Sequence, residues 1–108
     1  MKDAREISGL LKRVKEVLQS AYGDRLRKVI LYGSFARNQA SGESDIDIAV
    51  VLNGEVDKIK EIERIHDLIY PLALEYGEVI SVNPISEREL TDTEWPLYEH
   101  IRKEGVPV

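Results

Sequence analysis

Apolar residues along the chain alternate between a helical spacing and a strand-like one. Over residues 4–22, six apolar residues fall at helical spacing with charges between them, which predicts an amphipathic helix. Gly23 and Asp24 then follow as a cap and turn. Over residues 56–73 the helical spacing returns, and it predicts a long middle helix.

Three short apolar runs predict buried strands. They cover residues 28–32, 45–52 and 78–83, and glycine, asparagine or proline bounds each of them. We expect Pro84 to end the third strand, because proline has no N–H group to donate to a sheet.

Shorter helices and one loop fill the remaining sequence. A short helix over 34–38 and a polar loop over 39–44 are expected after the first strand. Ser86 and Glu89 have the spacing of a capping box, so a short helix is expected there. A last helix is expected over 94–104.

This alternating order predicts one α/β domain over residues 1–108, with a small mixed β-sheet flanked by α-helices. The 43% hydrophobic and 32% charged residues are ordinary for a soluble globular protein. No run of about 18 apolar residues is present, so we expect no membrane span. The N-terminus has no signal-peptide core and cysteine is absent, which favours the cytoplasm.

The net charge of −5 argues against binding a long nucleic acid through its phosphates. The nearest basic cluster is Arg25, Arg27 and Lys28, which we interpret as a solvated strand entrance. A small anionic ligand carried with metal ions remains compatible with the charge.

Two aspartates mark the start of the second predicted strand. Side chains alternate along a strand, so Asp45 and Asp47 share one face with Ala49, while the isoleucines between them face the core. Carboxylates about 6.7 Å apart repel each other unless something positive lies between or beside them. Magnesium accepts one or two carboxylates together with substrate phosphates. A pair of such ions is the usual clamp for nucleotidyl displacement.

A glycine-serine pair ends the first predicted strand. Gly33 lets the backbone approach a ligand or take a positive φ, and Ser34 begins a turn whose N–H groups and hydroxyl can bind phosphate. Arg37, one helical turn further, is a second phosphate candidate, and a surface role fits it equally well. Alone, a Gly-Ser pair is most often a turn and an Asp-x-Asp most often a solvated strand start. Their combination between apolar strands favours a site.

Gly33-Ser34, ten residues, then Asp45-Ile46-Asp47 resembles the GSX10DXD signature of the polymerase-β-type nucleotidyltransferase superfamily. The short chain resembles its minimal nucleotidyltransferase branch. The resemblance implies a polymerase-β-like fold, magnesium (two ions with bound nucleotide) held by Asp45 and Asp47, and triphosphate held around Gly33 and Ser34. It also implies transfer of a nucleoside monophosphate, with ATP as substrate and AMP transferred.

Minimal nucleotidyltransferases are often paired with a helical HEPN protein. The resemblance therefore implies a hetero-oligomer in which this chain is the antitoxin and adds AMP to a tyrosine of a HEPN-type toxin.

The sequence departs from the superfamily at the third carboxylate, which normally lies on the next strand and activates the acceptor. The matching position is Ser81, between Ile80 and Val82. Glu78 is the closest acid and our candidate for the third catalytic carboxylate, although a regular strand places it on the opposite face and a solvated turn residue fits it at least as well. The alternative to an enzyme is a binding antitoxin that neutralises a HEPN partner by contact and only binds nucleotide.

Overall fold

The computed structural model describes residues 7–33, 35–36, 45–91 and 95–108. Its elements are α1 (Ser8–Tyr22), the 3-10 turn η1 (Gly23–Arg25), β1 (Leu26–Tyr32), β2 (Ile46–Leu52), α2 (Lys58–Tyr76), β3 (Ile80–Ser86), α3 (Glu87–Leu90), α4 (Pro96–Glu104) and β4 (Val106–Pro107). The three predicted strands and the first, middle and last predicted helices are all present, with ends shifted by a few residues. The predicted short helix over 34–38 and loop over 39–44 fall mostly outside the described residues.

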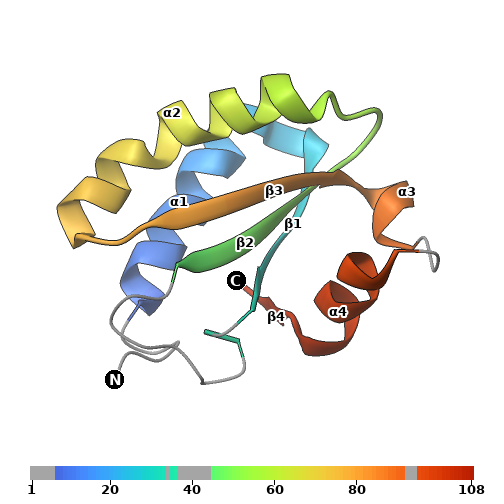
Figure 1. Ribbon diagram of the computed structural model, residues 1–108. Helices are drawn as coiled ribbons and strands as arrows, with labels where there is room; N and C mark the ends of the chain where they lie inside the picture. Colours follow the sequence, from blue (N-terminus) through green and yellow to red (C-terminus); the bar gives the residue numbers. More distant parts are fainter. Residues whose placement is uncertain (1–6, 34, 37–44, 92–94) are drawn as a thin grey trace.

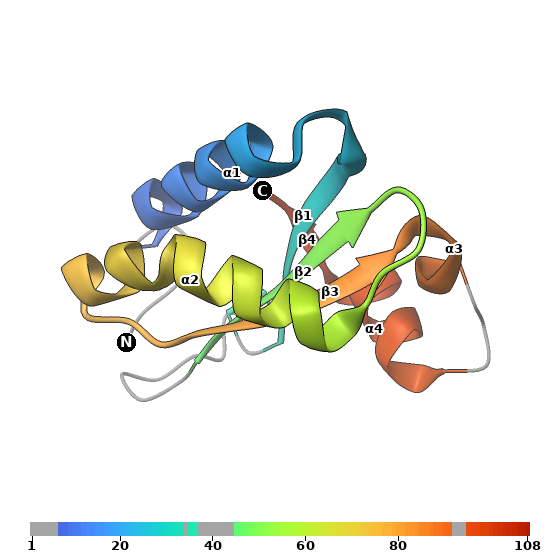
Figure 2. The same cartoon turned by 90° about the horizontal axis from the view of Figure 1, so that it is seen from above.

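The strands form one mixed sheet in the order β3-β2-β1-β4. β2 pairs with β3 in parallel, while β1 is antiparallel to both β2 and β4. Helices α1 and α2 lie together over one face of the sheet, and α3 and α4 lie on the other side (Figures 1 and 2). The small mixed sheet flanked by helices is therefore confirmed.

Alternation along β2 divides its side chains between two cores. Ile46, Ile48 and Val50 are buried against α1 and α2. Ala49 and Val51 belong to the smaller cluster under α3 and α4. Asp47 lies on the same face as Ala49, near the start of β2.

Pro84 does not end β3, and that prediction is wrong. Strand β3 continues to Ser86, with Pro84 in register with Val50. The Ile46 N–H donates to the Val79 carbonyl at 2.8 Å, so the odd-numbered residues of β3 bond to β2 and the even-numbered ones face the outer edge. The missing N–H of Pro84 costs no ladder bond there. Its carbonyl accepts a hydrogen bond from Lys58 Nζ at 3.2 Å.

The capping box predicted for the short helix is present, and α2 ends at a glycine. The Ser86 side chain accepts from the Glu89 N–H at 3.0 Å and Glu89 accepts from the Ser86 N–H at 3.2 Å, which confirms the capping box of α3. Helix α2 runs on to Tyr76 and ends where Gly77 takes the left-handed conformation at φ 64°. Among the described residues, no helix combines the length and the hydropathy needed to cross a bilayer.

The basic cluster at the start of β1 is only partly solvated. Arg27 and Lys28 are exposed, as predicted. Arg25 instead pairs with the buried carboxylate of Glu61 at 3.1 Å and donates to the carbonyls of Asn53 and Glu55. Arg25 thus connects the turn before β1 to the start of α2, a long-range contact that the local sequence pattern does not indicate.

Candidate active site

Gly33 lies directly against Asp47. Strands β1 and β2 pair with Tyr32 opposite Asp47, so Gly33 is the first residue beyond that pair. Gly33 has φ 74°, which L-amino acids with side chains rarely adopt. A methyl group on Gly33 would lie 3.2 Å from Cγ of Asp47 and would overlap its carboxylate oxygen Oδ2. Two features therefore require glycine at position 33: the positive φ and the close approach of the Asp47 carboxylate.

The two aspartates occupy the same end of the sheet. Asp45 immediately precedes β2 and is exposed, while Asp47, two residues later, is half-buried within the strand. Of the sequence-predicted site residues, the structure thus brings Gly33, Asp45 and Asp47 together. Ser34 and Arg37, the other two phosphate candidates, lie outside the described residues.

Ser81 takes the place on β3 beside Asp47. The two strands are parallel and pair Asp47 with Ser81, so both side chains lie on one face of the sheet. The β2–β3 register runs without a shift from the Ile46–Ile80 pair onward.

Glu78 lines a cavity of about 200 Å³ with residues of α2. It precedes β3, and the β2–β3 pairing begins two residues later, at Ile80. The Glu78 N–H donates to the Ala73 carbonyl at 3.0 Å, which holds this turn against the end of α2.

Two polar residues beside Asp47 were not identified from the sequence. Tyr32 is half-buried, and burial raises the pKa of its phenol, as does the negative charge of Asp47. A hydrogen bond with the Asn83 side chain lowers the pKa of the same phenol, and the net direction is upward. Asn83 pairs with Ala49 on the Asp47 face. The period-two alternation of the third predicted strand places Asn83 on one face with Ser81, and that was the signal available.

The donor set fits magnesium. Asp45 and Asp47 supply hard carboxylate oxygens, and the absence of a side chain at Gly33 leaves room beside Oδ2 of Asp47. Within the described residues, no group of three histidine, cysteine, aspartate or glutamate side chains forms a complete cage. A magnesium ion at this place therefore needs substrate phosphate and water oxygens as its remaining ligands, as is usual for this ion.

Comparison with known proteins identifies the family. The nucleotidyltransferase domain family matches residues 11–105, a span that includes Gly33, Asp45 and Asp47. The chain belongs to the nucleotidyltransferase domain family. Two relatives from Methanocaldococcus jannaschii, named as candidate protein adenylyltransferases, support the assignment. MJ0604 is 38% identical over 88% of this chain and 90% of its own length, and MJ0141 is 30% identical over 95% and 99%.

Solved structures agree with the fold of this nucleotidyltransferase. A structure described as a minimal nucleotidyltransferase is 26% identical, covers 99% of this chain and 97% of its own, and superposes with a TM-score of 0.58. A crystal structure of a toxin–antitoxin with AMP-PNP is 20% identical, covers 89% of this chain and 70% of its own, and gives a TM-score of 0.63. The resemblance to minimal nucleotidyltransferases is thereby confirmed, and the protein is a nucleotidyltransferase enzyme by family.

Proposed function

We propose that this nucleotidyltransferase transfers AMP from ATP to a partner protein in a magnesium-dependent reaction. The packing of Gly33 against the Asp47 carboxylate carries the proposal, because it sets a phosphate-binding turn beside a metal-binding acid. Asp45 and Asp47 bind magnesium, and Gly33, Ser34 and Arg37 bind the triphosphate.

The reaction is an in-line displacement. A hydroxyl oxygen of the acceptor forms a bond to the α-phosphorus of ATP, the bond from that phosphorus to the bridging oxygen breaks, and pyrophosphate leaves. Bound magnesium supplies charge neutralisation for the phosphates and the leaving group. The proton of the acceptor passes to water or to Glu78, because Ser81 is no carboxylate.

The acceptor is proposed to be a tyrosine of a HEPN-type toxin, with the present chain as its antitoxin in a cytoplasmic hetero-oligomer. The relatives are named as candidate protein adenylyltransferases, and two solved neighbours are toxin–antitoxin structures, one with AMP-PNP.

Label transfer tests the proposal. The protein is incubated with magnesium, ATP labelled at the α-phosphate, and the protein encoded beside it. We expect label on the partner with α-labelled but not γ-labelled ATP, because pyrophosphate carries the γ-phosphate away. Asp45→Asn and Asp47→Asn should abolish transfer, whereas Asp67→Asn, at an exposed position on α2, serves as the matched control. Equal transfer by all three variants would contradict the proposed roles.

A second function is favoured by the serine opposite Asp47. If Ser81 leaves the site without turnover, the protein binds ATP but neutralises its partner by contact alone. In that case the partner is inhibited equally by the wild type and by Asp47→Asn, and no label is transferred. Ser81→Asp separates the two functions further, since a carboxylate beside Asp47 should then create transfer that the wild type lacks.

A further inference from the structure

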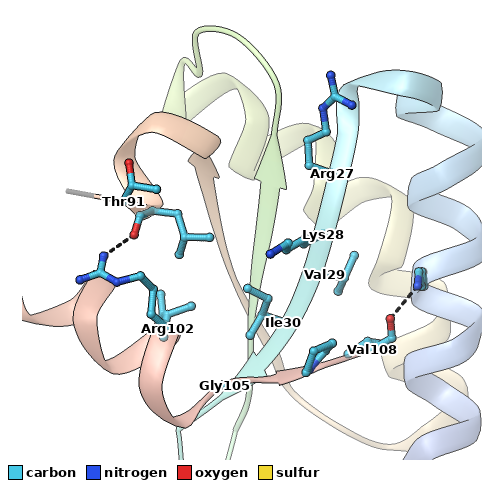
Figure 3. Close-up of a pocket in the computed structure, with 12 residues that line it drawn as sticks. Arg27, Lys28, Val29, Ile30, Thr91, Arg102, Gly105 and Val108 are labelled. Carbon is cyan, nitrogen blue, oxygen red and sulfur yellow. Dashed lines mark hydrogen bonds between the residues drawn. The ribbon is translucent and has the colours of Figure 1, made fainter. Parts of the chain in front are cut away.

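Two adjoining cavities flank the short strand β4. One, of about 430 Å³, lies between β1, α3, α4 and β4, and Figure 3 shows residues that line it. The other, of about 410 Å³, lies between α1 and β4. Lys15, Pro107 and Val108 line both cavities, so we treat them as one surface, the β4 groove.

The β4 groove is basic although the chain is acidic. Its lining includes five of the chain's 15 lysine and arginine residues. These are Lys12, Lys15, Arg27, Lys28 and Arg102. Among the described residues, no aspartate or glutamate lines either cavity. With a net charge of −5 overall, this concentration of positive charge marks the groove as a site for a negatively charged occupant.

The basic residues that line the groove come from three elements, α1, β1 and α4. Figure 3 shows Arg27 and Lys28 on β1 and Arg102 on α4, across the cavity from each other. Lys15 on α1 donates to a main-chain oxygen of Val108 at 2.7 Å. Arg27 also contacts Glu87 at 3.3 Å, and both of these side chains are exposed.

The floor of the groove is apolar. Ile30, Leu90 and Ile101 lie under one cavity, and Leu11 and Leu31 lie under the other. An occupant that matches this surface carries acidic groups for the rim and apolar groups for the floor. An acidic protein segment has both, whereas the phosphate backbone of a nucleic acid offers no apolar side chains to fill two cavities.

The groove also leads toward the catalytic end of the sheet. The cavity beside α1 is lined by Ser8 and Leu31, and Leu31 is two residues from Gly33. An extended segment that lies along β4 therefore runs beside the part of β1 that precedes Gly33.

We propose that the β4 groove docks an acidic, partly apolar segment of the partner protein that receives the nucleotide. The proposal rests on the proposed function in one respect, that the acceptor is a protein. Docking through the groove would raise the effective concentration of the acceptor segment near the site.

Peptide binding tests the groove without any chemistry. The probe is a short fluorescein-labelled peptide in which glutamate alternates with valine, followed by fluorescence anisotropy in the absence of ATP and magnesium. We expect binding that weakens as sodium chloride is added, and weaker binding of a peptide with glutamine in place of glutamate. Lys28→Glu and Lys12→Glu, both at exposed positions, should each weaken binding by about tenfold.

Lys60→Glu is the matched control. It makes the same charge change at an exposed position on α2, beside a cavity that Glu55 and Asp57 line. It should bind the peptide like the wild type, and circular dichroism should show all three variants folded. Equal binding by Lys28→Glu and Lys60→Glu, or equal binding of the glutamine peptide, overturns the proposal. Tighter binding of a single-stranded RNA of the same length at the same lysines also overturns it, in favour of an RNA site.

The two proposals fail separately. Asp47→Asn should bind the acidic peptide like the wild type, because Asp47 is not part of the groove. If peptide binding depends on Lys28 while no label ever reaches a protein, the groove stands and the transfer proposal fails. If label transfer survives Lys28→Glu and Lys12→Glu undiminished, the groove proposal fails and the transfer proposal stands.

Discussion

Replacing Gly33 by alanine tests the close contact on which the site depends. Alanine at φ 74° pays the steric cost of the left-handed region, about 1–2 kcal/mol. Its methyl group would also overlap Oδ2 of Asp47 and lie 3.2 Å from Cγ of Asp47. The carboxylate or the turn must therefore shift.

The magnitude of the catalytic effect follows from that shift. Displacing a reacting or positioning group by about 1 Å costs on the order of 100-fold in rate. We therefore expect Gly33→Ala to reduce nucleotidyl transfer about 100-fold and the free energy of unfolding by about 1–2 kcal/mol. A loss of about 1 kcal/mol lowers the melting temperature by roughly 4–8 °C in a domain of this size.

Gly54→Ala serves as a control that introduces the backbone strain of a positive φ without a steric overlap. Gly54 also has a positive φ, 86°, but nothing lies within 4 Å of a methyl group placed there. Urea unfolding should show a similar destabilisation in both variants, whereas label transfer should fall only in Gly33→Ala. If Gly33→Ala and Gly54→Ala transfer AMP equally well, the contact between Gly33 and Asp47 has no catalytic role and the reasoning fails.

Three further predictions follow from the polar contacts. Glu61→Gln should lower the free energy of unfolding by about 1–2 kcal/mol in urea titrations, less than the roughly 3–5 kcal/mol of a fully buried pair, because Arg25 stays 36% exposed and can be solvated. Burial alone would raise the pKa of Glu89, but its hydrogen bonds, one of them from Tyr98 at 2.7 Å, hold that pKa below its ordinary value. The pKa of Glu89 is thus lower in the folded than in the unfolded protein, so ionised Glu89 stabilises the fold at neutral pH. This contribution to the free energy of unfolding is lost as the pH falls below 4.5 and through the folded-state pKa. Glu89→Gln should therefore make the free energy of unfolding less dependent on pH in that range. Asp47→Asn should lower the pKa of Tyr32, because a negative charge beside the phenol is removed, and spectrophotometric titration against Tyr32→Phe measures the change.

The period-two and helical patterns of apolar residues predicted the main strands and helices of the fold. The alternation around Asp47 correctly separated the core-facing isoleucines from the aspartate face, because that pattern reports which side of a strand is buried. Ser81 beside Asp47 was likewise the position that the pattern indicated.

The features that the sequence pattern did not predict depend on pairing between distant segments of the chain. The sequence does not show that the nitrogen of Pro84 faces the outer edge of the sheet, where a strand can continue through proline. Strand β4 has two residues, too few for a periodic signal, and forms only because it pairs with Ile30 and Leu31. The burial of Glu61 against Arg25 and the hydrogen bond between Tyr32 and Asn83 likewise join residues far apart in sequence.

Intact-mass spectrometry of the partner shows whether AMP is transferred to a protein. The protein encoded beside this nucleotidyltransferase is expressed with the wild type, with Asp47→Asn, or with the control Asp67→Asn, and then purified. We expect the partner to gain the mass of one adenylyl group (AMP less water) with the wild type and the control, on a tyrosine by peptide fragmentation, and to stay unmodified with Asp47→Asn. A partner that is unmodified in all three cases and is nonetheless neutralised would contradict the account and establish an antitoxin that acts by binding alone.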